Sequence, residues 1–280
     1  MKVAISFRWF LVVAVISSLA FVLPKTPANH TEAAAACGLT NTTFQNGEEL
    51  TYVIYYNLNA MWVSAGEVSF KATDIGTQYL LSATGKSYSS YDWFFKVRDE
   101  FTAYVDKKTM YPYVSVRNVQ EGGYAVYDRV TFDQSAHKAT SKRGRTAKQT
   151  ETKQFELGDC MHDVLSVLFY VRNLDFQHMT VNSSVPVKVF LDQETYPLSV
   201  KYLGKETRSI KDNGKYNTIH LSPEVVTGGV FKPGSQMHVW ATDDANRVPL
   251  LIESPIRVGA IKCVLKSTKN LRYPNASKIK

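Results

Sequence analysis

One stretch of the chain, from Asp159 to Asn173, has the pattern of an α-helix that is apolar around most of its circumference. Asp159 follows Gly158 and is a good N-cap, and Arg172 falls in the last turn, where the helix dipole favours a cation. The apolar residues that recur at helical spacing are Met161, Val164, Leu165, Leu168 and Val171. Such a helix has to be covered on several sides, so we expect the rest of the chain to fold around it.

The rest of the mature sequence has the pattern of β-strands separated by turn residues. Val185 to Asp192, for example, alternates apolar and polar side chains, as a strand with one buried face does. Gly66, inside the candidate strand from Met61 to Thr73, is expected at a β-bulge or at a close approach of two backbones. The short spacing between strands leaves no room for crossover helices, so it predicts an antiparallel meander, sandwich or barrel.

The candidate strands before the helix span residues 50–57, 61–73, 79–88, 101–105, 112–119, 124–132, 137–142 and 148–155. Those after it span residues 185–192, 197–203, 205–211, 216–221, 237–242, 248–253 and 258–266. Because strands occur on both sides of the helix, one sheet built from both halves of the chain can enclose it. We therefore predict an all-β fold, with an antiparallel curved sheet or open barrel wrapped around one central α-helix near residues 160–173. Residues 37–280 are expected to form a single domain.

Residues 1–36 are expected to be a signal peptide for export. Lys2 and Arg8 form a basic start, the run from Trp9 to Leu23 is apolar, and the alanines from Ala33 to Ala36 suit a signal peptidase. A single membrane anchor is the alternative, but the apolar run is shorter than the roughly 20 residues that a spanning helix needs. We therefore expect an exported chain that begins at Cys37.

The composition suits a folded, β-rich protein. Hydrophobic residues make up 44% and aromatic residues 12% of the chain, and the formal net charge is +8. Much of the positive charge lies in one run with few apolar residues: Lys138, Lys142, Arg143, Arg145, Lys148 and Lys153. We interpret this run as a solvated hairpin rather than a patch for acidic glycans, lipid head groups or nucleic acid. No nucleic-acid partner is expected, since no binding motif accompanies the charges.

The three cysteines, at positions 37, 160 and 263, allow one disulfide in an oxidising compartment. Cys263 shares a strand face with Ile261 and Leu265 and is expected to be a small buried side chain. Cys37 and Cys160 are expected to pair. Two alternatives remain open: Cys160 is a reactive thiolate at a helix N-terminus, or Cys37 is lipidated after cleavage of the signal.

No run of residues close in sequence predicts a catalytic site. Cys160, His162 and Asp163 are near one another, but residues two apart on a helix point to different faces, so Cys160 and His162 cannot form a catalytic dyad. The segment from Asp243 to Arg247 lacks the spacing of a calcium loop and is expected to be a hairpin turn.

Residues far apart in sequence suggest no site either. Asp99 or Glu253 could pair with another carboxylate as in glycosidases, but no spacing singles out a partner. His220 and His238 lie in candidate strands, without the spacing of a metal motif. We therefore expect no catalytic residue, no cofactor and no metal ligand.

Aromatic side chains are the remaining candidates for a binding site. Trp62, Trp93, Phe94 and Trp240 lie in or beside candidate strands and could line an apolar pocket. The alternative is that they belong to the ordinary core.

Several short motifs of the sequence together resemble those of a known family. They lie at residues 44–52, 90–99 (Ser-Tyr-Asp-Trp-Phe-Phe-Lys-Val-Arg-Asp), 121–124, 160–166 (Cys-Met-His-Asp-Val-Leu-Ser), 190–192, 239–249 and 252–259. Over nearly the whole mature chain, the sequence resembles the domain-of-unknown-function family numbered 3108, exported proteins of Bacteroides-type Gram-negative bacteria. The resemblance implies cysteines matching Cys37 and Cys160, and a small apolar residue in place of Cys263. It also implies an all-β exported fold with a helix, similar to the open barrels of periplasmic lipoprotein carriers, and it names no catalytic residue.

The function that these observations favour is that of a non-catalytic binding protein in the periplasm or at the outer membrane. Its expected ligand is apolar or amphiphilic, such as a lipid or a lipid-linked glycan, held in an aromatic-lined groove of the curved sheet. Peripheral association with the envelope is compatible with this expectation, and the oligomeric state is left open. Two alternatives remain: a hydrolase of envelope glycans, and a structural envelope component without a cavity.

Overall fold

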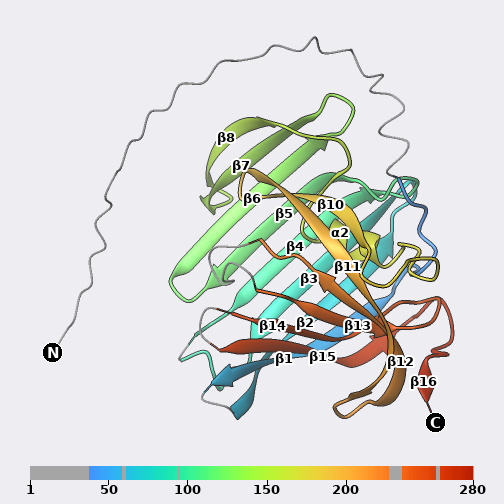
Figure 1. Cartoon of the computed structure of the whole chain (residues 1–280). Coiled ribbons are helices and arrows are strands. Elements are labelled where there is room, and N and C mark those ends of the chain that lie inside the picture. The colour runs from blue at the N-terminus through green and yellow to red at the C-terminus, as the bar shows by residue number, and fades with distance from the viewer. Residues whose placement is uncertain (1–37, 59–60, 94, 227–234, 257–258, 280) are drawn as a thin grey trace, which may run out of the picture.

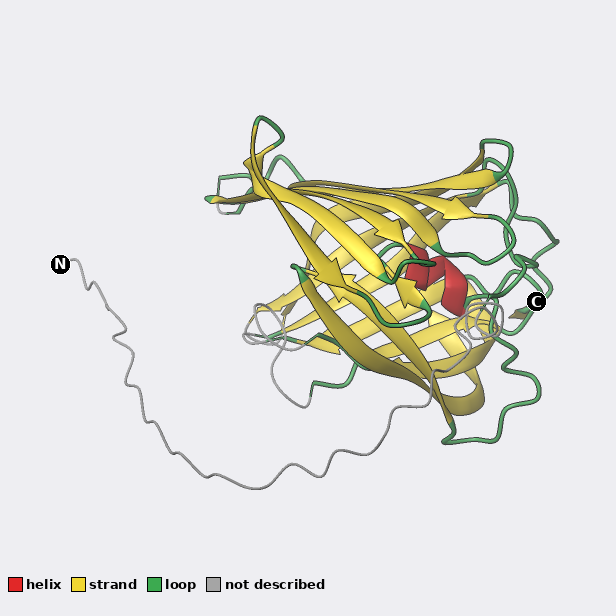
Figure 2. Ribbon diagram, turned by 90° about the horizontal axis from the view of Figure 1, so that it is seen from above, coloured by secondary structure: helices red, strands yellow, loops and turns green. Residues whose placement is uncertain are grey.

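The computed structural model describes residues 38–58, 61–93, 95–226, 235–256 and 259–279. Its strands belong to one sheet of 16 strands, which curves strongly around a short helix on its concave side (Figures 1 and 2). The N-terminal part is a meander of β1 (Glu49–Leu58), β2 (Met61–Asp74), β3 (Gln78–Ser87), β4 (Arg98–Asp106), β5 (Pro112–Glu121), β6 (Tyr124–Asp133), β7 (Lys138–Thr146) and β8 (Gln149–Glu156).

The C-terminal part contains the helix and the remaining strands. They are β9 (Met161–His162), α2 (Ser166–Val171), β10 (Ser184–Leu191), β11 (Glu194–Ile210), β12 (Gly214–Pro223), β13 (His238–Thr242), β14 (Pro249–Pro255), β15 (Ala260–Lys269) and β16 (Lys278–Ile279). The two parts join at β1, which pairs with β2 on one side and with β15 on the other.

The sheet is curved but not closed. Its order runs from β8 through β1 and β15 to β9, and β16 pairs separately with β12. The described strand pairs are antiparallel except for β9 with β10, which are parallel. The prediction of an all-β fold with one curved antiparallel sheet built from both halves of the chain is therefore confirmed.

Two glycines allow irregularities in long strands. The register of β1 and β2 shifts opposite Gly66, and a Cβ atom there would collide with the carbonyl oxygen of Lys86, so Gly66 is both a bulge and a close approach, as predicted. The predicted strands 197–203 and 205–211 are in fact the single strand β11. Gly204 has φ +108° and sits where the register of β11 against β12 shifts, so it bends the strand instead of ending it.

The predicted central helix near residues 160–173 is wrong. The helix α2 has only six residues, from Ser166 to Val171. Cys160 has φ +61°, which a helix does not allow, and Met161 and His162 are extended and pair with β10.

The side chain of Asp163, and not that of Asp159, makes the turn into α2. Its Oδ1 accepts hydrogen bonds from the backbone N–H groups of Leu165, at 2.8 Å, and Ser166, at 3.3 Å. The apolar spacing that suggested a longer helix therefore includes residues that are buried in extended conformation.

The two ends of the sheet approach each other through side chains. Phe190 of β10 packs against Phe132 of β6 and Phe155 of β8, with ring centroids 6.1 and 5.5 Å apart. Beside them, Asp192 Oδ1 accepts from Arg117 of β5 at 2.6 Å and from Arg143 of β7 at 2.5 Å. These contacts keep the sheet curled, so that α2 is held inside the curve.

Candidate functional site

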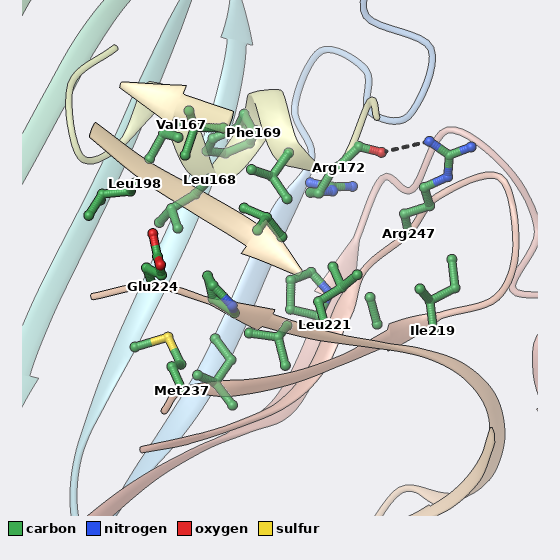
Figure 3. Close-up of a pocket in the computed structure, with 18 of the residues that line it drawn as sticks. Val167, Leu168, Phe169, Arg172, Leu198, Ile219, Leu221, Glu224, Met237 and Arg247 are labelled. Carbon is green, nitrogen blue, oxygen red and sulfur yellow. Dashed lines mark hydrogen bonds between the residues drawn. The ribbon is translucent and has the colours of Figure 1, made fainter. Parts of the chain in front are cut away.

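The concave side of the sheet contains an apolar cavity of about 270 Å³ beside α2 (Figure 3). Figure 3 shows Val167, Leu168 and Phe169 of α2 on one side, facing Leu221 of β12 across the cavity. Leu168 lines the cavity and is still 49% exposed to solvent, which is unusual for a leucine on a buried helix.

Strand alternation builds the opposite wall. Because successive side chains of a strand point to opposite faces, residues two apart line the same wall. Three neighbouring strands each contribute two such residues: Val187 and Val189, Leu198 and Val200, and Ile219 and Leu221. These six side chains are aliphatic and offer water no hydrogen-bond partner, so this part of the wall suits an apolar ligand.

The polar side chains of the wall are few: Tyr52, Arg172, Ser199, Glu224 and Arg247. Tyr52 donates its hydroxyl to the carbonyl oxygen of Pro249 at 2.9 Å. The guanidinium of Arg172 is buried and paired with Glu48, at 2.6 Å between Nη1 and Oε1 and 3.1 Å between Nη2 and Oε2. This ion pair also anchors the C-terminal end of α2 to the start of β1.

Arg247 and Glu224 mark opposite ends of the cavity (Figure 3). Arg247 Nη1 donates to the carbonyl oxygens of Arg172, at 3.2 Å, and of Leu174, just after α2. Burial holds the pKa of Arg247 below its usual value. Glu224 is exposed and follows the end of β12. The cavity is therefore apolar in its middle and charged only at its ends.

The aromatic residues predicted to bind a ligand lie elsewhere. Trp62 and Trp93 are 40% and 83% exposed, and neither lines the cavity. Phe94 lies outside the described residues. Trp240 is buried on the opposite face of β13 from the cavity-lining Val239. Its ring stacks on His220, with centroids 4.5 Å apart, and under the guanidinium of Arg208, at 4.2 Å.

Sequence reasoning missed the aliphatic wall because its signal is weak. The alternation of Val187, Val189 and Leu191 predicted a buried strand face, but any core strand has that pattern. Only the curvature of the sheet and the shortness of α2 leave space in front of this face.

His162, Asp163 and Ser166 form a buried polar cluster that does not have the geometry of a catalytic triad. His162 Nδ1 and Ser166 Oγ are 3.3 Å apart, and the same Oγ accepts from the backbone N–H of Asp163 at 3.1 Å. All three residues are at most 3% exposed. A substrate cannot reach them, so the cluster stabilises the turn into α2.

Burial predicts a pH-dependent role for His162 in stability. It lowers the pKa of His162 from 6.5 to about 3, so the folded protein needs the neutral ring. Its contribution is fully present above pH 6.5 and is lost as the pH falls from 6.5 towards 3, by about 1.4 kcal/mol per pH unit. We expect His162→Gln to remove this slope in urea unfolding measured between pH 4 and 6.5.

Two features make the His162 comparison specific. Asp163, whose pKa burial raises, contributes the opposite slope in both proteins, so their difference isolates His162. The control is His178→Gln, because the side chain of His178 is 84% exposed. Equal slopes for His162→Gln and the wild type would contradict the interpretation.

The carboxylates considered for hydrolysis do not flank either described cavity. Asp99 shares a hydrogen bond with Glu121, and burial raises the pKa of both groups. Glu253 forms a salt bridge with Lys262, at 2.9 Å. Among the residues of the described ranges, no group of three metal-ligating side chains comes together, and no helix could cross a membrane.

The structure describes two of the three cysteines, Cys160 and Cys263. Cys263 is free and packs against the core around Leu250 and Leu265. Cys37 lies outside the described residues, so its pairing with Cys160 stays a prediction. The segment from Asp243 to Arg247 forms the expected turn between β13 and β14, where Asp244 Oδ1 accepts from the backbone N–H of Asn246 at 3.0 Å.

The fold and the cavity define a β-barrel-like, all-β protein with an apolar interior site. The chain belongs to the protein family of unknown function DUF3108, whose model matches residues 51–266. The structure is similar to that of a β-barrel-like protein of the family of unknown function DUF1849 from Brucella abortus. That similarity has a TM-score of 0.55 and 8% identity, over 83% of this chain and 100% of the other, and concerns the fold alone.

A protein of YmcC-like fold from Bacteroides fragilis covers 83% of this chain and 100% of its own, with a TM-score of 0.29 and 11% identity. A protein from Chlamydia trachomatis covers 84% of this chain and 92% of its own, with a TM-score of 0.35 and 5% identity. No curated protein sequence matches the chain.

Proposed function

We propose that this protein binds the apolar chain of a lipid-like ligand in the cavity between α2 and the concave face of the sheet. The observation that carries the proposal is the cavity itself, whose wall is mostly apolar, with few polar side chains. An apolar void excludes water and loses the dispersion contacts of its lining, so an apolar ligand that fills it is bound favourably.

The size of the cavity limits the ligand. At about 270 Å³ it lies near the lower end of small-molecule sites, which begin at about 300 Å³. It therefore suits one apolar chain or a small hydrophobic ring system rather than a complete lipid with two chains. Each methylene group buried there contributes about 0.8 kcal/mol to binding.

The two alternative functions have less support. A hydrolase of envelope glycans needs two carboxylates that face one cleft, whereas Asp99 and Glu121 hydrogen bond to each other outside both described cavities. A purely structural protein would use its aliphatic side chains to fill the interior, and here the interior is not filled beside Leu168 and Leu198.

We also propose that the protein is exported. A signal peptide over residues 1–36 and a disulfide between Cys37 and Cys160 would place the protein in the periplasm or at the outer membrane, where lipids and lipid-linked glycans occur. The basic start at Lys2 and Arg8 and the apolar run from Trp9 to Leu23 support this location.

The proposal predicts that Leu198→Trp blocks the cavity. Leu198 lines it without being fully buried, so an indole can extend into the space with little strain on the core. We expect the wild type to bind the fluorescent probe 1-N-phenylnaphthylamine at one site, and Leu198→Trp to bind it at least about tenfold more weakly, since a loss of 1.4 kcal/mol is tenfold.

The matched control is Lys201→Trp, which adds the same ring to the opposite, exposed face of β11. It should bind the probe as the wild type does. Native mass spectrometry of protein purified from its own envelope should also detect a co-purifying apolar molecule in the wild type and none in Leu198→Trp. Failure of the wild type to bind the probe, or equal binding by a folded Leu198→Trp variant, would refute the proposal.

A further inference from the structure

Five exposed apolar side chains, four of them aromatic, lie together at one end of the sheet. They belong to the β1–β2 turn, the β3–β4 connection and the β5–β6 turn. We call this set the aromatic rim: Met61 (68% exposed), Trp62 (40%), Trp93 (83%), Phe95 (49%) and Tyr124 (54%). In an antiparallel meander, alternate connections fall at the same end of the sheet, so the three connections are neighbours.

Backbone hydrogen bonds hold these connections side by side. The N–H of Gly122 donates to the carbonyl oxygen of Lys96 at 2.8 Å, which joins the β5–β6 turn to the β3–β4 connection. The N–H of Tyr88 donates to the carbonyl oxygen of Ala65 at 3.0 Å, which joins that connection to β2. These hydrogen bonds hold the connections that carry the aromatic rim in one arrangement. The aromatic rim includes every Trp and Phe among the large apolar side chains that are exposed in the described ranges.

The cavity reaches the same end of the molecule. His238 at the start of β13 pairs with Glu253 near the end of β14, and Pro255 pairs with Ala260, which in turn pairs with Asn57 before the β1–β2 turn. The cavity-lining Glu224 and Met237 flank β12 and β13 at this end. An apolar ligand that leaves by this end emerges beside the aromatic rim.

Positive charge accompanies the aromatic rim. Lys96 follows Phe95, and Arg145 and Lys148 lie at the β7–β8 turn, which falls at the same end of the meander. All three are exposed, and none forms a salt bridge within the described part of the chain. The acidic groups nearby are engaged: Asp92 pairs with Arg98 at 2.6 Å, and Asp99 and Glu121 hydrogen bond to each other.

We propose that the aromatic rim docks the protein on the surface of an anionic lipid bilayer, with the cavity facing the membrane. Trp and Tyr favour the interface between head groups and acyl chains, and basic side chains are attracted to anionic head groups. The rim side chains come from three separate connections, so they project at three points along one end of the sheet. A protein partner would instead need a continuous packed surface.

The experiment measures binding to vesicles of 70% phosphatidylcholine and 30% phosphatidylglycerol by cosedimentation. It uses the predicted mature chain, residues 37–280, produced without export, because the apolar run from Trp9 to Leu23 would itself bind lipid. We expect the wild type to bind, and Trp93→Ser with Phe95→Ser to reduce the affinity on the order of a hundredfold. Lys96→Gln with Lys148→Gln should reduce it more moderately and remove most of its salt dependence.

The matched control is Ile75→Ser with Tyr273→Ser, which removes two exposed apolar side chains from the opposite end of the sheet. This variant should bind vesicles as the wild type does. The docking proposal fails if the wild type does not bind vesicles, if Trp93→Ser with Phe95→Ser binds as tightly as the wild type, or if the control loses binding equally.

The docking test is separable from the test of cavity binding. Leu198→Trp should bind vesicles normally, whereas Trp93→Ser with Phe95→Ser should bind 1-N-phenylnaphthylamine normally, since neither rim residue lines the cavity. Loss of vesicle binding together with probe binding in the rim variant would indicate misfolding, and its urea unfolding midpoint then decides between misfolding and a shared site.

Discussion

Replacing Arg172 by methionine is expected to lower the free energy of unfolding by about 3 to 5 kcal/mol. The substitution leaves the carboxylate of Glu48 in an environment where its side chain is 1% exposed, without the two guanidinium bonds at 2.6 and 3.1 Å. It also removes the Arg172 bonds to the carbonyl oxygen of Asn246, at 2.9 Å from Nη2 and 3.3 Å from Nε. Urea unfolding followed by circular dichroism measures the loss.

Two further variants test whether the loss comes from the unpaired buried charge of Glu48. Arg172→Met combined with Glu48→Leu should recover much of the stability, because no unpaired charge is then buried. Lys269→Met breaks the neighbouring but exposed pair of Lys269 with Glu49 and should cost less than about 1 kcal/mol. If Arg172→Met is as mild as Lys269→Met, the buried pair does not anchor α2 to β1.

The ion pair of Arg172 with Glu48 could not be predicted from the sequence. A cation in the last turn of a helix was expected to interact with the helix dipole, and nothing local pointed to Glu48, which is 124 positions away. The pair forms because the curved sheet brings the start of β1 under the end of α2. Partners at such separation depend on tertiary structure and leave no pattern in a single sequence.

The helix prediction failed for a similar reason. The spacing of Met161, Leu165 and Leu168 is helical, but Met161 and His162 form backbone hydrogen bonds with β10 and are buried there. Strand pairing with a remote segment outweighs a local helix propensity of a few tenths of a kcal/mol per residue. The antiparallel strands were predictable because alternation and turn residues are local, and most of their limits differ from the prediction by only a few residues.

The candidate site was the least predictable part. Trp62, Trp93 and Trp240 were expected to line it and do not; most of its wall is aliphatic, and its aromatic members are Tyr52, Phe70, Phe169 and Phe176. Sequence patterns indicate which strand faces are apolar, but they do not indicate whether an opposing element fills the space. Here α2 is too short to do so. The exposure of Trp93 was equally invisible, because an aromatic residue in a loop can lie in the core or at the surface.

The second large effect is expected from the proposed disulfide. In protein exported to an oxidising compartment, Cys160→Ser should lower the free energy of unfolding by about 4 to 5 kcal/mol, since a disulfide across a loop of about 120 residues restricts the unfolded chain. Cys263 is free, so Cys263→Ser is the matched control and should change stability much less. Urea unfolding of the oxidised proteins, together with non-reducing peptide mapping, measures both.

A double-variant cycle distinguishes the disulfide from its two alternatives. If Cys37 and Cys160 pair, Cys37→Ser, Cys160→Ser and the double variant should lose the same stability, because any one change removes the whole cross-link. A reactive Cys160 thiolate predicts little loss from Cys37→Ser and labelling of Cys160 by iodoacetamide in the native protein. A lipidated Cys37 predicts an N-terminal peptide with acyl mass, and then Cys160→Ser acts independently of Cys37→Ser. Additive losses would therefore exclude the pairing, whereas equal losses together with a linked peptide would establish that the segment before β1 is tied to the strand end that precedes α2.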